Sequence, residues 1–209
     1  MDKQQIFAAC TQMRRDTADW LEGLTPEQLD TQSLCSEWAV RGVAGHLIGS
    51  VSLPMAALLW RTACSGFNPH RANVSLGNEL GARSGPEIAT DLRSHAGAEL
   101  TVPFVGAHGP FTDLLVHNAD MRVPLKEPWQ PEVELSVESL AFLAKGAVGF
   151  TSRKRLAGLR LVATDARFTA GEGEEIRGPA LHLVLAVCGR AVGLETLEGA
   201  GRDVLAGRL

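Results

Sequence analysis

The sequence predicts an α+β protein in which a helical bundle is followed by a small mixed unit. The amino-terminal 150 residues carry apolar residues at helical three-and-four spacing. Capping-box sequences, and a proline inside a long apolar run, mark the ends of several helices. After a basic segment, short stretches bounded by turn residues predict strands. We therefore expect two domains, a four-helix bundle over residues 1–152 and a small α+β domain over residues 153–209.

The first 24 residues predict one amphipathic helix. Its apolar residues form a single stripe with charged residues opposite: Ile6, Cys10, Met13, Trp20 and Leu24. The sequence TPEQ follows at 25–28, with a threonine cap, a proline at the first helical position and a glutamine that can reach back to the cap. A second, short helix is expected to begin there.

A long apolar helix is expected from about Val40, through His46, toward Trp60. Pro54 must kink or interrupt it, because proline lacks an N–H group and clashes with the preceding turn.

Three more segments predict helices. SGPE at 84–87 is a capping box that opens a helix ending near residue 98. GPFTDLLVHNADMRVPL at 109–125 is bracketed by Gly-Pro and by Pro124. The segment 136–150 supplies a helix whose inward residues are expected to be Leu140, Leu143 and Val148.

The carboxy-terminal part changes character. GLRLVATD and ARFTAG predict two short strands, and GEGEEI predicts a tight acidic turn into a third. GPALHLVLAVCGR predicts a buried helix. A unit this small is expected to need packing against the bundle for stability.

Composition excludes some classes of function. The net charge of −4 argues against nucleic-acid binding, which needs a basic face. The only basic cluster, TSRKRLAGLR at 151–160, is expected to be a solvated connector, with a phosphate or RNA site as the alternative.

No signal peptide or membrane-spanning run is recognisable, so a cytoplasmic protein without membrane contact is expected. The four cysteines are widely spaced, which predicts reduced thiols and argues against disulfides and a structural zinc finger. Cys35 stands out because it precedes Trp38 at a helix start, where thiolates are stabilised.

One set of residues suggests metal chemistry. Asp113 and His117 are four residues apart and share a helix face, and Asp120 lies close to that face. Together with His46 from another helix they would form a set of two histidines and one carboxylate, which suits catalytic Zn²⁺ and also Fe²⁺ or Ni²⁺. Spacing alone does not join the two helices. His46 could instead be a core histidine, and Asp113 and His117 a surface pair.

The residues also resemble a known family. CSEWAVRGVAGHL resembles the C-x-x-W-x-V-x-x-V-x-x-H-L signature of the maleylpyruvate isomerase-like, mycothiol-dependent proteins, which belong to the DinB-like metal-binding four-helix bundles. DLLVHNADMRVPL is similar to that family's metal-binding helix. The segment from GLRLVATD to CGR is similar to its small carboxy-terminal domain.

The resemblance implies a metal site made by His46, Asp113 and His117, with Asp113 at a position where the family has glutamate. It also implies that Arg190 holds a substrate carboxylate, and that Asp120 accepts a hydrogen bond from a ligating imidazole.

The implied activity is that of a mycothiol-dependent enzyme with a divalent metal, Zn²⁺ first, that catalyses isomerisation or thiol transfer on a small electrophile. Its partners would be a small-molecule substrate and a low-molecular-weight thiol. Two alternatives remain open: a non-enzymatic ligand-binding bundle with a lost or altered metal site, and a bundle used for homodimerisation or other partner contacts.

Overall fold

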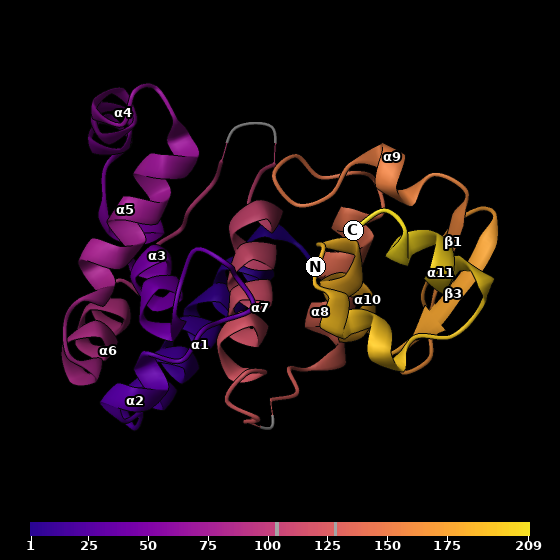
Figure 1. Cartoon of the computed structure of the whole chain (residues 1–209), viewed down its shortest axis with the longest axis horizontal. Helices are drawn as coiled ribbons and strands as arrows, with labels where there is room; N and C mark the ends of the chain where they lie inside the picture. Colours follow the sequence, from indigo (N-terminus) through magenta and orange to yellow (C-terminus); the bar gives the residue numbers. More distant parts are fainter. Residues whose placement is uncertain (103–104, 128) are drawn as a thin grey trace. The chain divides into compact units, whose positions relative to one another are not determined.

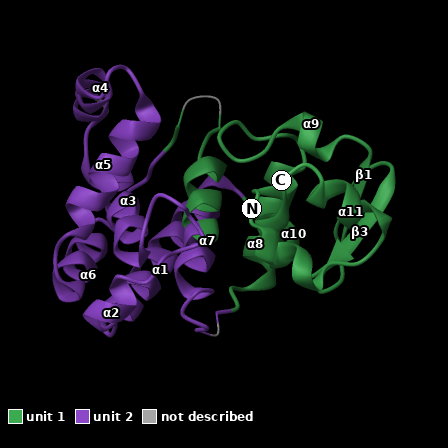
Figure 2. Ribbon diagram, viewed as in Figure 1, with its two compact units in different colours: residues 1, 101–116, 130–209 green, residues 2–100, 117–129 purple. Residues whose placement is uncertain are grey.

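The computed structural model describes residues 1–102, 105–127 and 129–209 (Figure 1). It is mostly helical with one three-stranded sheet, which confirms the α+β prediction. Two compact units are present (Figure 2): unit 1 holds residues 1, 101–116 and 130–209, and unit 2 holds residues 2–100 and 117–129. The units do not follow the expected division after residue 152, so domains over 1–152 and 153–209 stay a prediction.

The helices of the first 122 residues are α1 (Lys3–Glu22), α2 (Pro26–Leu29), α3 (Val40–Ser52), α4 (Met55–Cys64), α5 (Pro69–Gly81), α6 (Gly85–Ser94) and α7 (His108–Arg122). The later elements are α8 (Val133–Leu143), α9 (Arg153–Leu156), β1 (Leu159–Ala163), β2 (Thr169–Gly171), β3 (Glu174–Gly178), α10 (Ala180–Val187), the 3-10 helix η1 (Ala191–Thr196) and α11 (Ala200–Ala206). Within the described residues, no helix has both the length and the apolar character that crossing a bilayer requires.

Helix starts agree well with the capping signals. Thr25 and Ser84 form capping boxes at the beginnings of α2 and α6, as the sequence predicts. A third box, in which the Asp2 carboxylate accepts from the Gln5 backbone N–H, opens α1. The apolar stripe of α1 faces the interior of unit 2, with Ile6 and Leu21 fully buried.

Pro54 interrupts the long apolar run as expected. The chain is helical in α3, leaves the helix after Ser52, and resumes at α4 with Pro54 in the N-cap position. The next helix, α5, was not predicted. Asn68 caps it by accepting a hydrogen bond from the Arg71 backbone N–H.

Helices α3 and α5 pack backbone against backbone. Glycines from both helices lie at the contact, and the Leu76 and Trp38 side chains pack beside them. A Cβ atom on Gly45 would collide with the carbonyl oxygen of Gly77, and one on Gly81 would collide with the carbonyl oxygen of Arg41. The close approach brings His46, the neighbour of Gly45, within reach of side chains on α5.

Unit 1 combines α8 with the carboxy-terminal elements. The sheet has the order β2-β1-β3, with β1 antiparallel to β2 and parallel to β3. Helix α10 is buried almost throughout and packs on α8, β1 and η1. The three predicted strands and the buried helix are therefore present.

The prediction of a core position is wrong for one residue of this unit. Leu140 and Leu143 are buried, but the Val148 side chain is 82% exposed. The reason is that α8 ends at Leu143, and residues 147–151 form a tight turn closed by hydrogen bonds between Ala147 and Thr151.

Candidate metal centre

Three segments of unit 2 place polar side chains together: the loop before α3, helix α3, and the carboxy-terminal half of α7. The loop is tied to α7 because the Leu34 backbone N–H donates to the carbonyl oxygen of Asp120 at 3.0 Å. On its other face, α7 is joined to α1 by a hydrogen bond of 2.9 Å from the Thr17 hydroxyl to the Asn118 side-chain oxygen. These contacts attach residues 117–122 of α7 to the rest of unit 2.

His117 is oriented by a buried carboxylate. Its Nδ1 lies 2.9 Å from Oδ2 of Asp120, a side chain with no exposed surface. The same oxygen accepts a hydrogen bond of 3.1 Å from the thiol of Cys35. Since the carboxylate can only accept, Nδ1 of His117 is the donor in this hydrogen bond. Asp120 therefore has the position that the sequence predicted for it.

His46 is oriented by a neutral amide. Its Nδ1 lies 2.9 Å from the side-chain oxygen of Asn73 on α5. Its ring stacks on the buried indole of Trp38, with centroids 5.0 Å apart and planes 20° from parallel. The amide oxygen is an acceptor, so Nδ1 of His46 is the donor in this hydrogen bond.

The two imidazoles lie edge to face, with their centroids 4.9 Å apart. One nitrogen of each, together with a carboxylate oxygen of Asp113, lies within 4.8 Å of the others. Asp113 is half-buried and stands one turn before His117 on α7. Tetrahedral zinc with bonds of about 2.1 Å separates its ligands by about 3.4 Å, so the three groups need only small shifts to share one ion. The donor types and their spacing fit a divalent cation.

A second cluster shares His117 with the first. The ligand atoms of Cys35, His117 and Asp120 also lie within 4.8 Å of one another. Here, however, the thiol and the imidazole both point their hydrogen-bond donors at one carboxylate oxygen. This arrangement is typical of a hydrogen-bonded support for His117 rather than of a place for an ion.

Sequence reasoning missed Asn73 and gave Trp38 no role in the site. Trp38 donates from its indole N–H to the carbonyl oxygen of Val74, which fixes the surface on which His46 stacks. Asn73 could not be recognised from local sequence, because its partner His46 lies 27 residues away on another helix.

Arg190, the expected carboxylate-binding residue, belongs to unit 1. It is half-buried at the start of η1, and its guanidinium donates to the carbonyl oxygen of Cys188 at 2.8 Å. Its expected role toward a substrate stays a prediction.

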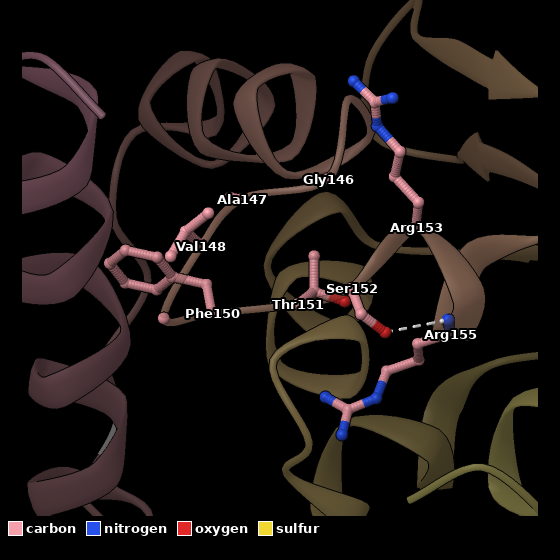
Figure 3. Close-up of a pocket in the computed structure, with 9 residues that line it drawn as sticks. Gly146, Ala147, Val148, Phe150, Thr151, Ser152, Arg153 and Arg155 are labelled. Carbon is pink, nitrogen blue, oxygen red and sulfur yellow. Dashed lines mark hydrogen bonds between the residues drawn. The ribbon is translucent and has the colours of Figure 1, made fainter. Parts of the chain in front are cut away.

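The basic segment lines a pocket in unit 1 (Figure 3), whose wall runs from Gly146 to Arg153 and includes Arg155. Arg153 donates to the carbonyl oxygen of Lys145 and Arg155 to that of Val187. In Figure 3 the two guanidinium groups point in opposite directions, so they do not converge on one anion.

Comparisons with known proteins point to one family. Residues 10–105 match the family model described as the mycothiol maleylpyruvate isomerase N-terminal domain. The fold is similar to a crystal structure of the mycothiol-dependent maleylpyruvate isomerase, with a TM-score of 0.57, 13% identity, and coverage of 96% of this chain and 94% of that one. A structure of a histidine-to-alanine mutant of that enzyme matches with the same TM-score and coverage at 12% identity. A comparison with curated protein sequences finds no match.

Proposed function

We propose that the protein is a metal-dependent enzyme that uses a low-molecular-weight thiol, because residues 10–105 match the family model of the mycothiol maleylpyruvate isomerase N-terminal domain. The thiol is proposed to be mycothiol, and the substrate a small electrophile that carries a carboxylate. The reaction is proposed to be an isomerisation or a thiol transfer.

One observation carries the proposal: one nitrogen each of His46 and His117 and a carboxylate oxygen of Asp113 lie within 4.8 Å of one another, and each imidazole has a hydrogen-bond partner at Nδ1 that orients its ring. The nearby Asp113 carboxylate supplies the third donor and a negative charge that favours a cation.

A divalent cation bound there, Zn²⁺ first and Ni²⁺ or Fe²⁺ as alternatives, would supply acidification of a coordinated thiol, so that the thiol is a nucleophile near neutral pH. The role of the protein residues would be to hold the metal ion and to orient its ligands. His46 and His117 donate through Nε2, and Asp113 through its carboxylate. Asp120 accepts a buried hydrogen bond from Nδ1 of His117, which orients that ring and raises the basicity of its other nitrogen.

Substrate recognition is proposed to use Arg190. A guanidinium matches a carboxylate with two parallel hydrogen bonds, which orients the substrate as well as binding it. The resemblance to the family supports this role, and the Arg190 side chain already has one anchor on the Cys188 carbonyl oxygen.

The first experiment measures the metal content of the purified, untagged protein by mass spectrometry, beside His46→Ala and His95→Ala variants. His95 is the control, since it directly follows α6 and its ring forms hydrogen bonds with the Ser94 hydroxyl and the Asp91 carbonyl oxygen. We expect about one divalent metal per wild-type chain, loss of it in His46→Ala, and retention in His95→Ala.

A wild-type protein that binds neither Zn²⁺ nor Ni²⁺ after their addition would contradict the proposal and favour a non-enzymatic ligand-binding bundle. With metal present, the same preparation is assayed for thiol-dependent isomerisation and for thiol conjugation of a carboxylate-bearing electrophile. Catalysis that needs the thiol and is lost in Arg190→Ala supports the proposed roles.

A further inference from the structure

We propose that Asn73 is a positioning residue for His46, with an amide oxygen that holds the Nδ1 proton and thereby commits Nε2 to the metal. The inference rests on the proposed metal site and extends it to α5, a helix that supplies none of the proposed ligands.

The contact between Asn73 and His46 is built into the packing of α3 on α5. The two backbones meet at Gly45 and Gly77, so a short side chain on α5 reaches the ring on α3. The His46 ring is held from two sides, by the Trp38 indole against its face and by the Asn73 oxygen at its edge. The ring has little freedom to flip, and the acceptor at Nδ1 favours a proton on that nitrogen.

The two proposed histidine ligands have unequal supports. His117 donates to a buried carboxylate and His46 to a neutral amide. A carboxylate is the stronger acceptor and makes the opposite ring nitrogen more basic. His46 should therefore be the weaker donor of the two. This leaves more positive charge on the metal, which favours acidification of a bound thiol.

The test compares Asn73→Leu and Asn73→Asp with the same two substitutions at Asn78. Asn78 is a matched control because it is an exposed asparagine on the same helix, five residues further along. Zinc affinity is measured by competition with a chromophoric chelator, and far-UV circular dichroism with thermal unfolding of the metal-free proteins confirms the fold.

We expect Asn73→Leu to bind zinc about 10–100-fold more weakly, the usual cost of removing a partner of a ligating histidine. Asn73→Asp should bind at least as tightly as wild type, since it keeps the acceptor and adds charge. Both Asn78 variants should match wild type. Wild-type affinity in Asn73→Leu, or an Asn73→Asp variant as weak as Asn73→Leu, would overturn the proposal.

A second measurement needs no metal. The ¹⁵N chemical shifts of the His46 ring distinguish a proton on Nδ1 from one on Nε2. We expect Nδ1–H in wild type and in Asn73→Asp, and a shift of the population toward Nε2–H in Asn73→Leu.

The two readouts separate the two proposals. Failure of wild type to bind zinc, with the Nδ1–H tautomer present, would refute the metal site and leave Asn73 as a residue that only orients His46 within the fold. An Nε2–H tautomer of His46 in wild type would refute the role of Asn73, whatever the zinc result. An Asn73→Leu variant that does not fold leaves the decision to the tautomer of wild type and to Asn73→Asp.

Discussion

Asp113 is the proposed ligand with the shortest side chain, at a position where the family resemblance implies glutamate. Its carboxylate nevertheless lies in the group whose donor atoms are within 4.8 Å of one another. It shares α7 with His117 one turn away, so its distance to that ring is set by helix geometry. A longer side chain would approach an ion without movement of the helix.

Replacing Asp113 tests whether the length of this side chain limits the affinity for zinc. We expect Asp113→Glu to bind zinc as tightly as wild type or more tightly, because the added methylene lets the carboxylate close on the ion. Asp113→Ala should bind zinc about 100-fold more weakly or worse, because loss of a ligand costs more affinity than loss of a hydrogen-bond partner of a ligand. Zinc competition with a chelator measures both, with Asp16→Ala on the exposed face of α1 as control. Equal affinities of wild type and Asp113→Ala would show that Asp113 is not a ligand.

A residue of the site could be predicted from the sequence only when its partner in the site lies nearby in the chain. Asp113 and His117 could be paired because a helix brings every fourth residue to one face. Cys35 and Asp120 are 85 residues apart, and Asn73 lies on a helix that was not predicted. Their hydrogen bonds arise from tertiary packing, which leaves no spacing pattern in the sequence.

At the scale of helices, the contact of α3 with α5 is the element on which the site depends most. At Gly45 and Gly81 the contact is glycine against main chain, so no side chain there can move aside. A methyl group here must push the helices apart, and that movement would separate the His46 ring from Asn73.

Gly45→Ala tests this contact. We expect a loss of about 1–3 kcal/mol in the free energy of unfolding, the usual cost of overpacking, together with weaker zinc binding. Urea unfolding and chelator competition measure the two effects. Gly97→Ala is the control, because nothing lies within 4 Å of a Cβ atom at Gly97. A Gly45→Ala protein as stable as Gly97→Ala would contradict the close approach.

The ends of helices could be predicted from the sequence, because capping residues and prolines act on neighbouring backbone groups. The packing of the helices could not be predicted in this way. Thr25, Ser84 and Pro54 could be interpreted because capping and the missing proline N–H act on neighbouring backbone groups. Val148 could not be placed correctly, since its apolar character fits a helical face but the chain turns after Leu143.

For the whole molecule, we expect the free energy of unfolding to fall at alkaline pH because the buried thiol of Cys10 titrates. Burial raises the pKa of Cys10 from 9.0 to about 11, partly offset by the nearby Arg14. Above pH 9 the unfolded chain loses this proton first and the folded chain retains it. Stability is therefore complete below pH 9 and falls as pH rises toward 11, by about 2–3 kcal/mol in total.

Urea unfolding of wild type and Cys10→Ala at several pH values between 7 and 10 measures this effect. Burial also lowers the pKa of Arg122 to about 10, which adds stability with rising pH, but only above that value. The interval from pH 9 to 10 therefore reports mainly on the thiol. We expect a falling free energy of unfolding in wild type and a flatter profile in Cys10→Ala, which starts lower because of its cavity. Parallel profiles would assign the dependence to other groups.

Asp120 joins two parts of the chain twice, through its backbone to Leu34 and through its carboxylate to Cys35. In evolutionary terms, these positions cannot drift independently. A lineage that exchanged Cys35 for a bulky residue would displace the carboxylate that supports His117, and one that exchanged Asp120 would leave the thiol and the imidazole without their shared acceptor. We therefore expect a change at either position to disturb the other, so that the loop and the helix act as one unit at this point.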